Sequence, residues 1–360
     1  MTIKIERIGG RFRADISLYD SEGAYHRERK FVPGATLEEA RRNAKARENQ
    51  LYNHGAKPPP KQAPSLREFG ERWIREYAIA NGQKPSSIAA KETILRLHLL
   101  PVLGALPLDQ IGEPEVQRLK LQLSGLRDKT KGCVLSVLTG LLKTAHRWGE
   151  IQAVPHIARI KVAQEEMEFY DFEEWERLVE GAARAGPVVL CAILLGGAAG
   201  LRRGEVVALD QADVGGGYVT VSRNDWRGHV GSTKGGKSRR IPLSPRLEAA
   251  VSEVRHLRGP RLLYFNDHPA TALDLNRAME KACARAGLPR SQSFHALRHT
   301  FGSHLAMKGA PVTTIQKLMG HANIRETMRY MHLAKGSAEA AIALLEQGNG
   351  PKALKETQRG

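Results

Sequence analysis

Three histidines and one arginine lie within the stretch HALRHTFGSHL, residues 295–305. At 100° per residue in a helix, His295, Arg298, His299 and Gly302 fall on one face. Cationic donors in a first helical turn, beside free backbone N–H groups and a glycine, suit an approaching anion. The opposite face carries the apolar residues Leu297, Phe301 and Leu305. The stretch therefore predicts a helix with one apolar core face and one polar face that could bind an anion.

Two other interpretations of this helix have to be weighed. His295 and His299 have the i, i+4 spacing of the zinc motif HExxH, but Ala296 occupies the position of its general-base glutamate. Alternatively, the helix is an ordinary one capped by Ser293, with histidines that bond to neighbours. From this stretch alone, the ordinary capped helix is favoured.

Five further residues could do chemistry, although each alone is unremarkable in type. Arg202 and Glu205 in GLRRGE have the i, i+3 spacing of a surface ion pair, worth only about 0.2–0.5 kcal/mol. Lys234 borders a Gly-Gly turn, and a solvated lysine is normal there. His321 follows a glycine at a helix junction, and Tyr330 lies on a helix where tyrosines usually pack. Their order along the chain carries more information than any one of them.

The chain carries the following motifs in order: GLRxxE, a hairpin lysine, HxxR, GH, and a tyrosine nine residues after the histidine of GH. In this arrangement the chain resembles the tyrosine recombinase (phage integrase) family. The stretch HALRHTFGSHLAMKGAPVTTIQKLMGHANIRETMRYMH resembles the family's carboxy-terminal signature almost throughout. The resemblance implies a nucleophile at Tyr330 and a supporting acid at Glu205. It implies further catalytic residues at Arg202, Lys234, His295, Arg298 and His321.

The departures from the family pattern are mild. Ala199 stands where the family usually has Thr, Gly204 where Ser is common, and Ala296 where Asp often follows the histidine. None of these removes a reacting group. Lys237, on the other side of the turn, competes less well for the role of Lys234.

The residues suit attack on a phosphodiester. Two guanidiniums can grip the phosphate oxygens bidentately and stay charged at working pH. Tyr330 must lose its proton as it attacks, and His295 could assist. His321 could donate a hydrogen bond to a phosphate oxygen, and the resemblance implies that Lys234 protonates the departing 5′-oxygen. The product would be a 3′-phosphotyrosine, with no cofactor and no metal required.

Composition agrees with a DNA-directed protein. The chain has 360 residues, a net charge of +17 and an apolar content of 41%. Such a charge attracts polyanions, of which nucleic acid is the commonest in a cytoplasm. Three scattered cysteines argue against a disulfide framework and against a cysteine zinc site. We expect no membrane span and no signal peptide, hence a cytoplasmic, nucleoid-associated protein.

The chain divides by pattern into several parts, and the predicted fold is multi-domain, mainly α with small antiparallel β-sheets. Residues 1–55 predict a three-stranded sheet and a helix opened by Thr36 and Glu39, and the resemblance implies an arm-type DNA-binding domain there. Basic residues on or near its strands are candidate DNA contacts: Arg11, Arg13, Arg27, Arg29 and Lys30. The linker 56–64 follows, stiffened by three prolines.

The helical patterns continue after this linker. Residues 65–152, opened by Ser65 and Glu68, predict an all-helical unit that resembles the family's core-binding (SAM-like) domain. A second linker covers residues 153–167. A catalytic α+β domain is predicted at 168–347, and a mobile tail at 348–360. Within the catalytic domain YVTVSR, HVGSTK and KSRRIPL read as strands, the last two joined as a hairpin at Gly235-Gly236. Helices are predicted at 171–184, 187–198, 202–209, 244–257, 271–286, 295–308, 312–319 and 324–331.

The expected partner is double-stranded DNA. One active site cuts one strand, so recombination needs a homotetramer on paired DNA sites, assembled from monomers and possibly aided by DNA-bending accessory proteins. SAEAAIALLEQ after Tyr330 could dock on a neighbouring protomer or pack on its own domain. Two other functions stay open: a type IB topoisomerase-like nicking and resealing enzyme, and a non-enzymatic DNA-binding protein on a recombinase scaffold.

Overall fold

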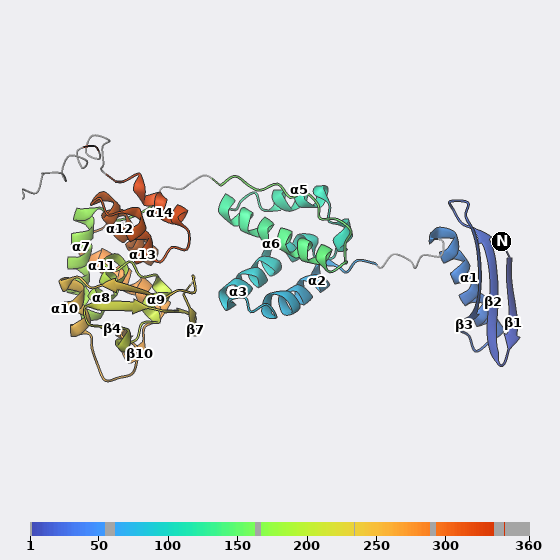
Figure 1. Cartoon of the computed structure of the whole chain (residues 1–360), viewed down its shortest axis with the longest axis horizontal. Helices are drawn as coiled ribbons and strands as arrows, with labels where there is room; N and C mark the ends of the chain where they lie inside the picture. The colour runs from blue at the N-terminus through green and yellow to red at the C-terminus, as the bar shows by residue number, and fades with distance from the viewer. Residues whose placement is uncertain are drawn as a thin grey trace, which may run out of the picture. The chain divides into compact units, whose positions relative to one another are not determined.

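The structure is a computed structural model that describes residues 2–54, 62–162, 167–233, 235–288, 293–334 and 342. The chain forms two compact units, residues 1–162 and 163–360. Helices predominate in both, and the strands form small antiparallel sheets (Figure 1). Within the described ranges, no helix combines the length and apolar composition needed to cross a bilayer.

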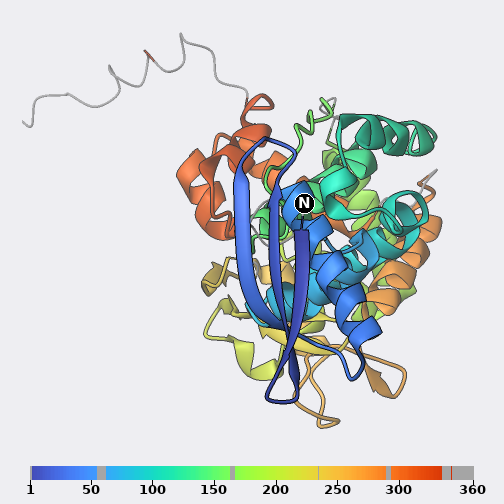
Figure 2. The ribbon, with the colours of Figure 1, turned by 90° about the vertical axis from the view of Figure 1, so that its right-hand side faces the viewer.

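A three-stranded sheet covered by one helix forms the amino-terminal part of the first unit. Strands β1 (Thr2–Ile8), β2 (Arg11–Tyr19) and β3 (Tyr25–Val32) lie side by side in this order, and α1 (Leu37–His54) packs on one face (Figure 2). The period-two pattern of β2 sets this packing, because alternate residues point to the same face. Its buried positions are the alternate residues Phe12, Ala14, Ile16 and Leu18.

Hydrogen bonds at the helix starts follow the predicted capping boxes. Ser65 Oγ accepts from the Glu68 N–H, and Glu68 Oε2 accepts from the Ser65 N–H at 2.9 Å. At α1, Thr36 Oγ1 accepts from the Glu39 N–H at 3.2 Å, whereas Glu39 Oε2 accepts from the N–H of Ala35. Each start thus satisfies backbone donors that the first turn leaves free.

The rest of the first unit is a helical bundle with its own core. Its described elements are helices, with π-helical turns at Trp73–Ile79 and Leu95–Leu99. Trp73 is buried at the centre, and its Nε1 donates to Thr144 Oγ1 at 3.1 Å, which satisfies the indole. The helices are α2 (Leu66–Arg72), α3 (Pro85–Ile94), α4 (Leu100–Leu103), α5 (Glu113–Gln122) and α6 (Asp128–Arg147).

The second unit is built around one apolar helix. Helix α8 (Pro187–Gly197) is almost wholly buried and contacts five neighbouring helices. Its near-continuous apolar sequence, PVVLCAILLGG, fits burial on all sides. The surrounding helices are α7 (Phe172–Ala185), α9 (Arg203–Val207), α10 (Pro245–Glu253), α11 (Ala272–Ala286) and α12 (Phe294–Met307). Helices α13 (Val312–Met319) and α14 (Ile324–Met331) pack on α12.

The predicted hairpin at Gly235-Gly236 is wrong. Strand β7 (His229–Ser232) pairs with β6 (Arg223–Trp226), whereas β8 (Arg239–Pro242) joins β4 (Val214–Gly215) and β5 (Tyr218–Val221) in the order β4-β5-β8. The pairing buries Val219 against Ile241, whereas the residues of β7 are exposed. A further short pair is β9 (Tyr264–Phe265) with β10 (His268–Pro269).

The chain instead reverses one turn earlier. Arg227 and Gly228 both have positive φ, 53° and 84°, and join the facing pair Trp226 and His229. Positive φ at both central residues is the geometry of a type I′ hairpin turn. Arginine rarely adopts it, which is why the sequence pattern pointed to the glycine pair instead.

Candidate active site

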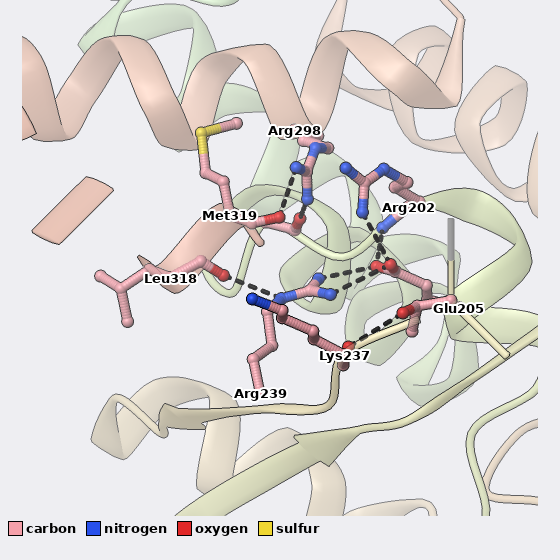
Figure 3. Close-up of polar contacts among 9 residues, drawn as sticks. Arg202, Glu205, Lys237, Arg239, Arg298, Leu318 and Met319 are labelled. Carbon is pink, nitrogen blue, oxygen red and sulfur yellow. Dashed lines mark hydrogen bonds and ion pairs between the residues drawn. The ribbon is translucent and has the colours of Figure 1, made fainter. Parts of the chain in front are cut away.

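A buried carboxylate holds two arginines together. Glu205 on α9 is 1% exposed. Its Oε1 accepts from Arg202 Nη1 at 2.9 Å, and its Oε2 accepts from the Arg202 N–H at 2.8 Å. Arg239 on β8 donates Nη1 and Nη2 to the same carboxylate at 3.0 and 2.7 Å (Figure 3). Glu205 therefore fixes both guanidiniums.

The protonation of Glu205 follows from these bonds. Burial alone would raise its pKa, but the hydrogen bonds and charges of Arg239 and Arg202 outweigh burial and hold the pKa below its ordinary value. The carboxylate is therefore ionised at neutral pH. One negative charge between two positive ones leaves the cluster with a net positive charge.

A third guanidinium lies close to this cluster. Arg298 on α12 is 1% exposed, and it donates Nη1 to Gly200 O and Nη2 to Met319 O, both at 2.5 Å (Figure 3). Burial and then the charge of Arg202 lower its pKa to about 9, which still leaves it charged at neutral pH. Ser293 stands at the predicted N-cap of α12, but its side chain makes no capping hydrogen bond.

Tyr330 is buried near Arg298, close enough for that charge to act on its phenol. It is on α14, 3% exposed, and its hydroxyl is 3.0 Å from Nδ1 of His299. Gly302 makes room for the ring, because a Cβ there would lie 2.8 Å from the ring atoms Cε1 and Cζ. Burial raises the pKa of Tyr330, and the charge of Arg298 opposes this effect. The hydroxyl is therefore protonated at neutral pH.

His321 packs on the other side of the tyrosine. It follows Gly320, whose φ of +64° ends α13 in the left-handed conformation. Its ring is parallel to that of Tyr330 at 6.3 Å, and Nδ1 is 2.9 Å from Thr327 Oγ1. Burial and then the charge of Arg298 lower the pKa of His321 to about 3. The neutral ring keeps Nε2–H as a donor when Thr327 donates to Nδ1.

Two predicted residues remain, His295 and Lys234. His295 is exposed at the start of α12, with its ring edge-on to that of His299 at 4.6 Å. Lys234 lies outside the described residues. A hydrogen bond joins the residues on either side of it in the chain: Thr233 Oγ1 donates to Lys237 O at 2.9 Å. The side chain of Lys237 is exposed.

Two residues of this cluster were not among the predicted site residues. Arg239 bonds Glu205 and also donates Nε to Leu318 O at 2.9 Å, which links β8 to α13. Its period-two spacing from the buried Ile241 places it on the inner face, so the strand pattern contained this signal. His299 had been placed on the same helical face as Arg298, but only the structure brings it to Tyr330.

One departure from the family pattern has a steric explanation. A Cβ on Gly204 would lie 2.4 Å from Asn224 Oδ1 and 2.6 Å from Asp225 O, both on β6. A serine would therefore require β6 to move. Ala199 and Ala296 are both buried, where a small side chain fits.

Gly302→Ala should lower the free energy of unfolding by about 1–3 kcal/mol, the usual effect of overpacking. The added methyl would meet the Tyr330 ring and Met319 Sδ, at 2.8 and 3.0 Å. Urea denaturation of the full chain measures the loss. Gly132→Ala is the matched control: its Cβ meets nothing within 4 Å, so a helical alanine should stabilise there. Equal effects at the two positions would contradict the steric argument.

Four of the five amino-terminal candidates share the sheet face opposite α1. Pairing of β2 with β3 sets Arg11 and Arg13 on that face with Arg27 and Arg29. Asp15 lies among them and accepts from Arg27 and Arg29 at 2.8–3.1 Å, which holds its pKa well below the ordinary value. Lys30 is opposite Ala14, on the face that α1 covers, and pairs with Glu28.

The zinc interpretation gains no support from the described residues. They contain no group of three or more His, Cys, Asp or Glu side chains placed to hold a metal ion. His295 and His299 therefore have no third ligand of these types in that part of the chain. An arginine-rich site around a buried phenol is suited to a phosphate diester rather than to a metal.

Family models match both units. One described as the phage integrase family matches residues 168–337, and one described as the phage integrase N-terminal SAM-like domain matches residues 65–122. The chain belongs to the phage integrase family. The predicted resemblance and fold class are therefore confirmed.

Individual relatives match over part of their length. A putative integrase of Pseudomonas phage Pf1 is 29% identical over 55% of this chain and 54% of its own. Tyrosine recombinase XerD of Brucella abortus is 37% identical over 38% of this chain and 45% of its own. The chain spans about half the length of the curated relatives it matches.

Solved integrases share the fold at lower identity. A Tn1549 transposon integrase in complex with a circular intermediate DNA has a TM-score of 0.67 at 21% identity, covering 80% of this phage-integrase chain and 100% of its own. A lambda integrase dimer bound to a core site has a TM-score of 0.63 at 17% identity, covering 91% and 94%. At these identities the likeness is one of fold.

Proposed function

We propose that this integrase-family chain is a site-specific DNA recombinase that integrates or excises a mobile element through a 3′-phosphotyrosine intermediate. The observation that carries the proposal is the juxtaposition of Tyr330 with the arginines of one unit. The tyrosine hydroxyl bonds His299, the residue next to Arg298, and the charges of Arg298 and Arg202 both act on its pKa. A phenol beside fixed guanidiniums can attack a phosphorus whose oxygens they hold.

The roles in this step follow from the bonding. Arg202, held by Glu205, and Arg298 would grip the non-bridging oxygens, where negative charge develops during attack. His321 would donate from Nε2 to one of them. Lys234 would protonate the departing 5′-oxygen. His295, in the first turn of α12, would assist proton transfer. The phosphotyrosine conserves the energy of the cleaved ester, so resealing needs no nucleotide cofactor.

The parts of the chain would divide the work of binding. In this proposal residues 1–55 form an arm-type domain, 65–152 a core-binding domain and 168–347 the catalytic domain, with linkers at 56–64 and 153–167. The outer sheet face with its arginines would meet DNA phosphates. The relatives named as phage integrases support a mobile element. An enzyme that acts on such DNA would work at the nucleoid in the cytoplasm.

We also propose assembly on DNA. One solved relative is a lambda integrase tetramer bound to a Holliday junction, and it shares the fold with a TM-score of 0.61. Four protomers would be needed to cut four strands, and the free chain would be a monomer. Proteins that bend DNA could assist the pairing of sites.

A nicked suicide duplex tests the proposed activity. Duplexes tiled across the ends of the mobile element that carries the gene are incubated with the full chain and run on a denaturing gel. A nick beside the scissile phosphate lets the short product diffuse away and traps any phosphotyrosine. We expect a covalent adduct, and peptide mass spectrometry should place the nucleotide on Tyr330. Tight binding of the same duplexes without an adduct would instead support a non-enzymatic DNA-binding protein.

A further inference from the structure

We infer that His299 is a catalytic residue: it accepts the proton of the Tyr330 phenol when the phenol attacks the DNA phosphorus. The inference rests on the proposed function and assigns a proton acceptor within it. Its starting point is the hydrogen bond between His299 Nδ1 and Tyr330 Oη, at 3.0 Å. A general base must lie within hydrogen-bond reach of the proton it takes, and His299 does.

The other two histidines of the site are placed differently. His321 Nδ1 is engaged by Thr327 Oγ1 at 2.9 Å, and its ring is parallel to the tyrosine ring at 6.3 Å, an arrangement suited to packing. His295 is exposed, and the half-buried His299 lies next to it on the same helix face, with ring centroids 4.6 Å apart. Tyr330 itself is 3% exposed, so water has little access to the phenol.

The charge state of His299 suits a proton acceptor. Burial, followed by the charges of His295, Arg329 and Arg298, lowers its pKa to about 4, so the ring is neutral at neutral pH. A neutral ring with Nε2–H presents the Nδ1 lone pair to the phenol. The charges of Arg202, Arg329 and Glu326 also act on the phenol, and His299 is near enough to His321 to act on its pKa.

A bound phosphodiester would raise the pKa of His299 and so make it a stronger base during the attack. Its negative charge offsets those of Arg298 and Arg202, and an added anion favours the protonated imidazole. The phenol becomes more acidic as its oxygen begins to bond to phosphorus. The proton can therefore move within an existing hydrogen bond while the nucleophile attacks.

The step balances as written. The Tyr330 O–H bond breaks and its proton goes to His299 Nδ1, while the Oη–P bond forms and the P–O5′ bond breaks. The departing 5′-oxygen takes its proton from a different group. During resealing the steps reverse: the imidazolium of His299 returns the proton to the phenolate as DNA is released.

Two substitutions separate proton transfer from positioning. His299→Asn keeps an acceptor oxygen near the place of Nδ1 but does not take up a proton at neutral pH, whereas His299→Ala removes both properties. His304→Asn is the matched control, because His304 is also half-buried on α12 but bonds Tyr170 O at 2.9 Å, away from Tyr330. The assay is single-turnover adduct formation on the nicked duplex, together with DNA affinity.

We expect His299→Asn to bind DNA as the parent chain does but to form adduct about 10²–10⁴-fold more slowly at neutral pH. The deficit should narrow as pH rises, since the phenol then ionises without help, and His304→Asn should match the parent. The deficit should persist on a duplex with a 5′-bridging phosphorothiolate, whose sulfur leaves without a proton. If that duplex restored the rate, His299 would act in protonating the leaving group rather than in deprotonating Tyr330. That result would overturn the inference.

The outcomes also separate this inference from the proposed function. A parent-like rate and pH profile for His299→Asn would reduce His299 to a packing residue while leaving recombination intact. Failure of the parent chain itself to form adduct would overturn the proposed function, and His299 would lose its role with it. If His299→Ala unfolds, His299→Asn still decides between these outcomes.

Discussion

Tyr330→Phe will form no covalent adduct with the nicked duplex, yet it will bind that duplex with the parent's affinity. The substitution deletes only the hydroxyl, and the phenyl ring can still fill the space above Gly302 and pack against His321. No other group in the described site can take its place, because the phenol is the only nucleophile that the proposed step uses. Denaturing gels measure the adduct, and native gels measure binding at a fixed salt concentration, since such affinity depends steeply on salt.

His332→Phe provides the control for this substitution. His332 lies two residues after Tyr330, just beyond α14, and it has no assigned role in the chemistry. Its variant should form adduct like the parent. An adduct that survives in Tyr330→Phe would show that another nucleophile cuts the DNA, and it would contradict the assignment of Tyr330.

Glu205→Ala should lower the free energy of unfolding by about 3–5 kcal/mol, the cost of leaving a buried charge without its partner. The bidentate bonds to Arg239 would be lost, and the side chain of Arg239 is only 8% exposed. Urea denaturation, read by hydrogen exchange in peptides of α8, reports on the unit that contains the pair. Glu176→Ala is the control, because its pair with Arg246 is on the surface and should be worth about 0–1 kcal/mol.

A second substitution at this position, Glu205→Gln, tests the pH dependence of the stabilisation. The arginines hold the pKa of Glu205 below its ordinary value of 4.5, so the folded state binds fewer protons there than the unfolded chain does. The stabilisation is fully present above the unfolded pKa and is lost as pH falls through the folded pKa. The gap between the parent and Glu205→Gln should therefore close under acidic conditions. A gap that stays constant down to acid pH would mean that packing, rather than charge, stabilises the cluster.

The helices of this protein were predictable because their signals are local. Capping residues, 3.6-residue periodicity and flanking glycines placed α10 to α14 to within a few residues. Strand pairing is not local, and there the prediction failed. The partner of β8 depends on which strand can bury Ile241, and the early turn places Arg227 at its first central position, where arginine is uncommon.

The candidate site divides in the same way. Motif order singled out Arg202, Arg298, His321 and Tyr330, and in the structure the charges of the two arginines act on both His321 and Tyr330. The period-two pattern of β8 places Arg239 on the inner face, but motif order does not show that Arg239 bonds Glu205, because that contact depends on the fold. The partnership of a histidine with Tyr330 likewise depends on how α14 lies across α12.

Arg202, Arg298 and the phenol of Tyr330 belong to one unit of one chain. This arrangement affects how the protomers would coordinate DNA cutting. On the proposed function, a protomer on a single half-site borrows no reacting group from a neighbour. Partner protomers would then control timing rather than supply chemistry. The apolar bed beneath Tyr330, formed with Phe301, Ile315 and Met319, offers a means for such control. A neighbouring protomer that moved α14 away from these apolar residues would displace Tyr330 and stop cleavage. It would not need to contact any charged side chain.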